Sequence, residues 1–218
     1  MPEQTISLFE VVARLGTGST FLALLMGGVI FQKLDFGMRT IVVLMVFSLT
    51  TSMILWNIPS GQLGTWVLRS FTLIEFVLIS IFFYSQTKRK VFRRVIIIAI
   101  ALFPLLVLID ALSQTQSLRD DFVTVCESAI LLGYSLVTLY HWMKEMQYDS
   151  ITSAPQFWIV SAILIYFGGN IFVFGSTNYA ASVSREVFNF VWTIQGSIGL
   201  VYYLTITFGF WKARKAYR

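Results

Sequence analysis

Long apolar stretches alternate with short polar segments along the whole chain. Seven of these stretches are long enough, or nearly so, to cross a bilayer about 30 Å thick as helices. The connections 57–64 and 176–185 hold Pro, Gly, Asn and Ser and are typical of turns. The pattern predicts an all-α bundle of seven transmembrane helices, forming one domain over residues 1–218. The expected spans are Leu8–Phe31, Thr40–Asn57, Trp66–Ser85, Arg94–Leu112, Phe122–Met143, Gln156–Gly175 and Val187–Trp211.

The composition favours the same class of protein. Of the 218 residues, 56% are hydrophobic and only 12% are charged, against about 25% charged in soluble domains. The net charge of +5 predicts contact with a lipid bilayer rather than with nucleic acid, because Lys and Arg in membrane proteins meet anionic lipid. The N-terminus has no basic region before its first apolar stretch, so we expect no cleaved signal peptide.

Basic residues mark one side of the predicted membrane. The connections after the second, fourth and sixth spans contain only two basic residues, Arg119 and Arg185. Since Lys and Arg collect on the cytoplasmic side, the N-terminus is expected outside and the C-terminus in the cytoplasm. The basic residues of the predicted cytoplasmic side are Lys33, Arg39, Lys88, Arg89, Lys90, Arg93, Arg94, Lys144, Lys212, Arg214, Lys215 and Arg218.

Polar side chains within the spans gather in the predicted outer half. Glu75 lies about 13 Å below Trp66 along its helix, near the middle of the membrane. A carboxylate in hydrocarbon costs about 2.5–3.5 kcal/mol on insertion scales, so it faces the bundle interior and has a partner. We therefore expect a ligand-binding site where five spans converge. Its candidate residues are Arg69, Glu75, Asp110, Glu127, Asn170, Asn189 and Gln195.

Tyr134 is a further candidate, because Glu127, Tyr134 and His141 are spaced by seven and lie nearly on one helix face. Small residues in the last span, Gly196 and Gly199, would let helices approach closely, and Gly168-Gly169 in the sixth span would do the same or open a local kink.

Each candidate also has a structural interpretation. Glu75 would be a neutral, hydrogen-bonded packing residue. Arg69 and Asp110 would form an ion pair or lie at the interface. Asn170 and Gln195 would join helices by hydrogen bonds.

Several kinds of chemistry lack their motifs. The sequence holds no HExxH, no GxSxG and no phosphate-binding glycine loop, and its single cysteine, Cys126, excludes an intramolecular disulfide. No metal site and no cofactor are predicted. A hydrolase that uses Glu75 and Glu127 as acid and base within the membrane stays open as a third hypothesis, although an enzyme is not favoured.

The third to seventh spans carry a resemblance. RSFTLIEFVLISIFFY, ESAILLGYSLVTLY, PQFWIVSAILIYFGGNIFVFG and WTIQGSIGLVYYLTITFGFWKARK resemble small bacterial seven-helix membrane proteins associated with sensor histidine kinases. The resemblance implies a sensor or receptor in the bacterial cytoplasmic membrane. It would bind a small ligand or lipid and signal through a separate cytoplasmic protein. The candidate docking residues are Lys88, Arg89, Lys90 and Arg93.

The alternative function is small-solute transport by alternating access. Pro155-Gln156 is similar to the dipeptide of the PQ-loop and sugar-semiporter group, whose second such dipeptide is missing here. A transporter needs a polar route to both faces. The inner halves of most spans are almost purely Ile, Leu, Val and Phe, which favours the sensor.

Overall fold

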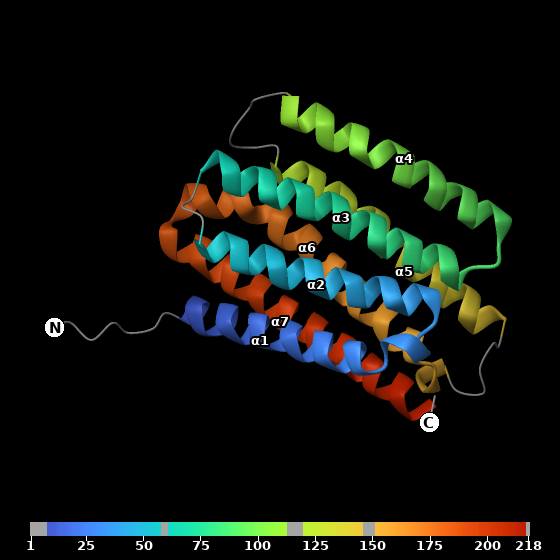
Figure 1. Ribbon diagram of the computed structural model, residues 1–218. Coiled ribbons are helices and arrows are strands. Elements are labelled where there is room, and N and C mark those ends of the chain that lie inside the picture. The colour runs from blue at the N-terminus through green and yellow to red at the C-terminus, as the bar shows by residue number, and fades with distance from the viewer. Residues whose placement is uncertain (1–7, 58–60, 113–119, 146–150, 217–218) are drawn as a thin grey trace.

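The computed structural model describes residues 8–57, 61–112, 120–145 and 151–216, which form helices and short connections without any strand (Figure 1). The predicted all-α class is confirmed for this part of the chain. The α-helices are α1 (Leu8–Val29), α2 (Phe36–Asn57), α3 (Gln62–Gln86), α4 (Lys90–Leu112), α5 (Asp120–Lys144), α6 (Pro155–Val183) and α7 (Arg185–Ala216). Two short 3-10 helices, Phe31–Lys33 and Ile151–Ser153, precede α2 and α6.

Consecutive helices run in opposite directions, and six of them close a ring (Figure 1). In this ring α1 packs on α2, α2 on α3, α3 on α5, α5 on α6, α6 on α7, and α7 back on α1. Helix α4 stands outside the ring and packs chiefly on α3. It buries only Phe92, Ile96 and Phe103.

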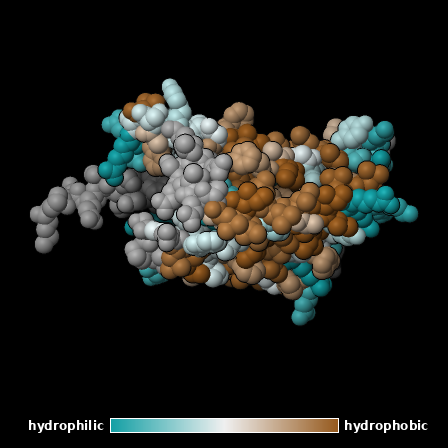
Figure 2. Space-filling model, turned by 90° about the horizontal axis from the view of Figure 1, so that it is seen from above, coloured by the Kyte–Doolittle hydropathy of each residue, from teal (hydrophilic) through white to brown (hydrophobic). Residues whose placement is uncertain are grey.

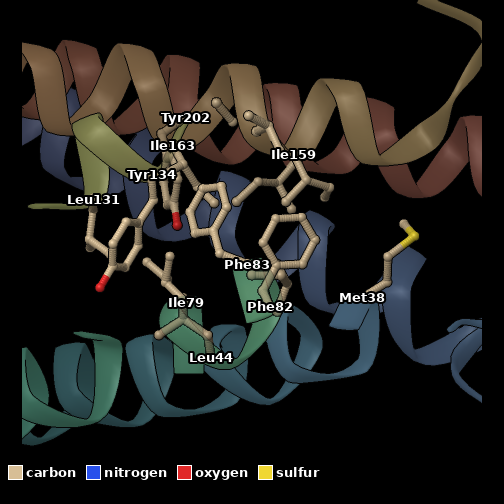
Figure 3. Packing of buried hydrophobic residues seen from close by; sticks show 14 of the residues in the cluster. Met38, Leu44, Ile79, Phe82, Phe83, Leu131, Tyr134, Ile159, Ile163 and Tyr202 are labelled. Atoms are coloured by element: carbon tan, nitrogen blue, oxygen red, sulfur yellow. The ribbon is translucent and has the colours of Figure 1, made fainter. Parts of the chain in front are cut away.

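The core of the ring is aliphatic and aromatic (Figure 3). Phe82, Phe83 and Ile79 of α3 meet Ile159 and Ile163 of α6, and none of the five is exposed. Such close packing replaces the hydrophobic driving force that is missing between helices in lipid.

The outer surface of the bundle is apolar along its middle. Six described helices, α2 to α7, are long and apolar enough to cross a membrane. Figure 2 shows hydrophobic side chains across the middle of the bundle and hydrophilic ones at its ends. Helices α4 and α7 show this most clearly, since only 11% of the most apolar stretch of each is buried inside the protein. The chain is therefore an integral membrane protein.

Helix α6 corrects one expectation. The segment 176–185 was predicted to be a turn, yet α6 continues to Val183 and α7 begins at Arg185. The hydroxyls of Ser176 and Thr177 both donate to the Val173 carbonyl, so these polar side chains are satisfied within the helix. The break falls on Ser184, whose hydroxyl accepts a hydrogen bond from the Val187 N–H at 3.2 Å and caps α7.

Pro155 and Gln156 have a local structural role. Pro155 is the first residue of α6, where a missing N–H costs nothing. The Gln156 side-chain amide donates to Asp35 Oδ2 at 3.0 Å, while Asp35 Oδ1 accepts from the Met38 N–H at 2.7 Å. The dipeptide thus joins the starts of α6 and α2.

Candidate functional site

A cavity of about 390 Å³ lies among helices α3 to α7, near the end where α3, α5 and α7 begin. Its volume falls in the range of small-ligand sites, roughly 300–1,000 Å³. Polar side chains from all five helices line it. The structure brings six of the eight predicted binding residues together there: Arg69, Glu75, Asp110, Glu127, Asn170 and Gln195.

Two buried carboxyl groups stand in the wall of the cavity. Helices α3 and α5 pack against each other. Glu75 lies next to the fully buried Phe76 on α3, and Glu127 lies next to the fully buried Ser128 on α5, so both carboxyl groups are in the buried part of their helices. The exposed fractions are 8% for Glu75 and 2% for Glu127. The carboxyl groups are close enough to interact electrostatically. Two such carboxylates repel each other, so they need a proton or a cation between them.

Arg69 forms an ion pair with Asp110. Arg69 Nη2 lies 3.0 Å from Asp110 Oδ2, which joins α3 to the outlying α4. The guanidinium also lies over the Trp66 ring, 5.7 Å from its centroid. The ion-pair interpretation of these two residues is confirmed, and both still line the cavity.

Amide oxygens add unpartnered acceptors to the wall. Asn170 is only 3% exposed. Asn170 Oδ1, Gln195 Oε1 and Glu127 Oε1 are buried and have no hydrogen-bond partner among the described residues. Most buried polar atoms in proteins do have a partner, so these three oxygens call for an explanation.

Helix α7 packs closely on α6 and on α1 beside the two amides. A Cβ atom on Gly169 would lie 2.6 Å from Ile198 Cδ1, and one on Gly196 would lie 2.7 Å from Val12 Cγ1. The predicted close approach is therefore present at Gly169 and Gly196. Helix α6 is continuous through Gly168 and Gly169. At Gly199 the expected close approach is absent, because a Cβ atom there would meet nothing within 4 Å.

Tyr134 and Asn189 lie outside the cavity lining. Tyr134 is buried deeper in the bundle, where its ring packs edge-on against Phe83 at 5.7 Å and Phe92 at 5.6 Å. It shares a helix face with Glu127 but lies about 10 Å further along the axis. Asn189 is exposed, because six residues on a helix turn it about 240° away from Gln195.

The sequence analysis did not predict that aromatic residues line the cavity. The cavity wall includes Phe71, Tyr166, Phe174 and Trp192. Helical spacing is the signal that finds two of them. Tyr166 precedes Asn170 by four residues and Trp192 precedes Gln195 by three, so each shares a face with its amide.

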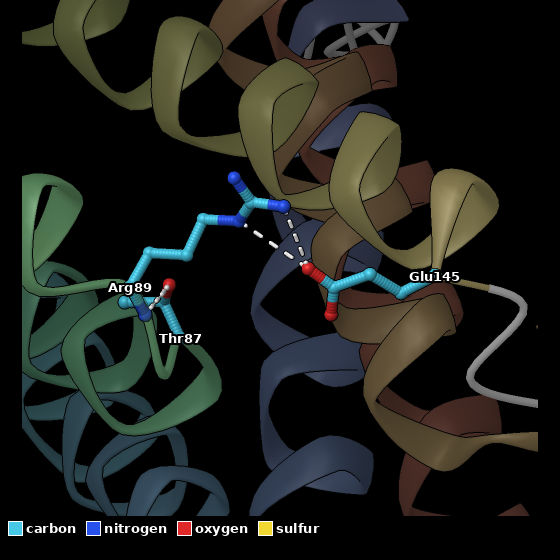
Figure 4. Close-up of polar contacts among 3 residues, drawn as sticks. All are labelled: Thr87, Arg89 and Glu145. Carbon is cyan, nitrogen blue, oxygen red and sulfur yellow. Dashed lines mark hydrogen bonds and ion pairs between the residues drawn. The ribbon is translucent and has the colours of Figure 1, made fainter.

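The predicted docking residues lie at the opposite end of the bundle. Arg89 Nη2 pairs with Glu145 Oε1 at 2.9 Å, and the Arg89 N–H donates to Thr87 Oγ1 (Figure 4). Arg93 Nε donates to the Thr87 carbonyl at 2.8 Å. Lys88 and Lys90 are exposed. These two lysines therefore present the most accessible charge of the four.

No protein-family model, curated protein or solved structure matches the chain. Its function is therefore inferred from the cavity, the core beneath it and the basic end.

Proposed function

We propose that the chain is a sensor or receptor module of the bacterial cytoplasmic membrane. Its cavity binds a small ligand or lipid, and its basic end passes the signal to a separate cytoplasmic protein. The observation that carries this proposal is the intramembrane cavity, whose described wall holds the carboxyl groups of Glu75, Asp110 and Glu127. Three acceptor oxygens of the wall, one of them on Glu127, have no hydrogen-bond partner among the described residues. Buried ionisable groups within a membrane generally mark a functional site.

The proposed topology has seven spans, with α1 as the first and the N-terminus outside. Support comes from charge: Lys33, Lys88, Lys90 and Arg214 are exposed at the end opposite the cavity. Arg185 stands at the cavity end, while Arg119 lies outside the described residues. The positive-inside rule then makes the cavity face the outside.

A packed core beneath the cavity favours a receptor over a transporter. The Phe76 ring stacks on Phe103 with centroids 4.0 Å apart, and Phe83 and Phe167 have no exposed surface. These side chains fill the bundle between the cavity and the basic end. A ligand bound above them would act by shifting helices rather than by passing through.

Side-resolved labelling tests the proposal. In a Cys126→Ser background, single cysteines replace Thr72 and Thr124, which line the cavity, and Tyr134, which lies below it. A membrane-impermeant thiol reagent is added to either side of oriented vesicles. We expect Thr72→Cys and Thr124→Cys to react from outside only, and Tyr134→Cys to react from neither side. Failure of both cavity positions to react would refute the proposed site.

The alternative is small-solute transport by alternating access. The observation in its favour is a series of buried hydroxyls beyond Glu127. Those of Tyr134 and Thr138 have no partner among the described residues, and Thr138 and His141 line a small pocket of about 40 Å³ at the basic end. Reaction of the same cavity cysteine from both sides would establish this alternative.

A further inference from the structure

We propose that the cavity recognises a small organic cation, an ammonium group with N–H donors on an apolar or aromatic body. This inference rests on the proposed function, since it names the ligand class of the same cavity.

The charge of the cavity wall favours a cation. Its ionisable residues are Arg69, Glu75, Asp110 and Glu127 among the described residues. Arg69 and Asp110 form an ion pair at 3.0 Å and offset each other. The described lining offers Glu75 and Glu127 no second Lys, Arg or His, so a bound cation would supply the opposite charge.

The hydrogen-bonding groups favour an ammonium. Three acceptors of the wall, Glu127 Oε1, Asn170 Oδ1 and Gln195 Oε1, lack a hydrogen-bond partner within the described part of the chain. The Trp192 Nε1–H donor also lacks one there, so the organic body of the ligand would have to offer it an acceptor or an aromatic face. A primary ammonium has three N–H donors and no acceptor, which matches three acceptor oxygens. A neutral hydrocarbon would leave these oxygens unsatisfied, and an anion would be repelled by the carboxylates.

The aromatic wall favours an organic body over a bare metal ion. Phe71, Tyr166, Phe174 and Trp192 line the cavity. Aromatic faces attract organic cations and give an apolar body its contact surface. Ca²⁺ takes about six to eight oxygen ligands, and Mg²⁺ keeps several waters, so a wall rich in aromatic rings suits them poorly. The Trp192 ring is held edge-on by Phe174 at 5.9 Å, which keeps it in the wall.

Binding of three phenyl probes tests the ligand class. The full-length protein in nanodiscs is titrated with 2-phenylethylammonium, neutral 2-phenylethanol and 2-phenylethyltrimethylammonium, which is cationic but has no N–H. Binding is measured by equilibrium dialysis and by the shift in melting temperature. We expect the primary ammonium to bind about tenfold or more tightly than the alcohol, with the quaternary ion between them.

Two variants assign the contact. Glu127→Gln should weaken binding of 2-phenylethylammonium about tenfold or more, because it removes a buried charge opposite the cation. Glu186→Gln removes an exposed carboxylate at the start of α7, at the same end of the bundle, and should leave binding unchanged. Should Glu127→Gln not fold, Gln195→Leu takes its place, with a smaller expected loss.

Equal binding of the ammonium and the alcohol, or no binding of either cation at millimolar concentration, overturns the cation inference. So does an unchanged affinity in Glu127→Gln. The labelling experiment separates this failure from failure of the proposed function. If Thr72→Cys reacts from outside and neither cation slows its reaction, the cavity stands and only the ligand class is wrong.

Discussion

Glu127 is the least exposed ionisable residue of the cavity wall, at 2%. One of its oxygens has no hydrogen-bond partner among the described residues, and Glu75 is its electrostatic neighbour. Arg69 has a carboxylate partner of its own in Asp110. The chemistry of the cavity therefore depends on the two glutamates more than on the arginine.

Substitutions of Glu75 test whether the cavity depends on this carboxyl group. Glu75→Gln keeps a polar group of nearly equal size, so we expect the melting temperature to stay close to that of the wild type. Glu75→Leu removes every hydrogen-bonding atom and should weaken 2-phenylethylammonium binding more than Glu75→Gln does. Binding by both variants that equals that of the wild type would remove Glu75 from the site.

The ion pair of Arg69 and Asp110 should be visible as a coupling. Removing one partner of a buried pair costs up to about 3–5 kcal/mol, and Arg69 is partly exposed at 23%, so Arg69→Met should cost less than that. The double variant Arg69→Met/Asp110→Leu should recover part of the loss, because no charge is left without its partner. The coupling energy between Arg69 and Asp110 is obtained by comparing the thermal melting, in detergent, of the two single variants and the double variant. Additive losses would contradict the pair.

Helix contacts set which face of each helix meets the cavity. On α7, Gln195 and Trp192 line it while Asn189 is exposed. On α5, Glu127 lines it while Tyr134 packs deeper between Phe83 and Phe92. Asn189 does not line the cavity because it points to another side of α7, and Tyr134 does not line it because it lies further along the axis of α5.

Gly169 tests the contact of α6 with α7. Because a Cβ atom would lie 2.6 Å from Ile198 Cδ1, Gly169→Ala should lower stability by about 1–3 kcal/mol. Gly175 is the matched control on the same helix, since a Cβ atom there would meet nothing within 4 Å. Gly175→Ala should leave stability unchanged or raise it by up to about 1 kcal/mol. The measurement is thermal melting in detergent.

The second-site variant Ile198→Ala provides the control for this contact. It removes the atoms that a Cβ on Gly169 would meet, so it should restore much of the stability lost in Gly169→Ala. A Gly169→Ala variant that melts with the wild type would show that α7 moves aside without cost.

Helix α4 is joined to the ring by few groups. Its buried residues are Phe92, Ile96 and Phe103, and the ion pair of Asp110 with Arg69 adds a polar contact. Most of its remaining side chains are exposed and apolar, as a lipid-facing helix requires. Since Asp110 also lines the cavity, a ligand there would contact the least anchored helix of the bundle.

The whole molecule has two unlike ends. One contains the cavity, and the other exposes lysines and arginines. The core between them is fully buried at Phe82, Phe83 and Phe210. A signal would therefore travel through the packing of helices, from the cavity to the basic end.

Under the proposed function, the basic end binds a separate cytoplasmic protein. Lys88→Gln/Lys90→Gln removes two exposed charges and leaves the pair of Arg89 with Glu145 in place. We expect weaker capture of a cytoplasmic protein in a quantitative pull-down, because association between charged surfaces is electrostatic. Arg185→Gln, at the other end, is the control. Equal capture by all three proteins contradicts the proposed docking role.

The sequence by itself determined the class of the protein and six of the residues that line the cavity. Six of the predicted spans correspond to helices α2 to α7 that are long and apolar enough to cross a membrane. Apolar length is a local property, so it is readable without the fold. The high cost of a carboxyl group in hydrocarbon likewise singled out Glu75 and Glu127 as residues of the interior.

Only the tertiary structure decided how these helices are arranged. Closure of the ring without α4, the pairing of Arg69 with Asp110 and the aromatic wall of Trp192 and Tyr166 depend on how each helix is rotated against its neighbours. In a span that is apolar on nearly every face, hydrophobicity does not fix that rotation. Contacts of small residues such as Gly169 and the few polar groups do so, because lipid and protein interior are equally apolar.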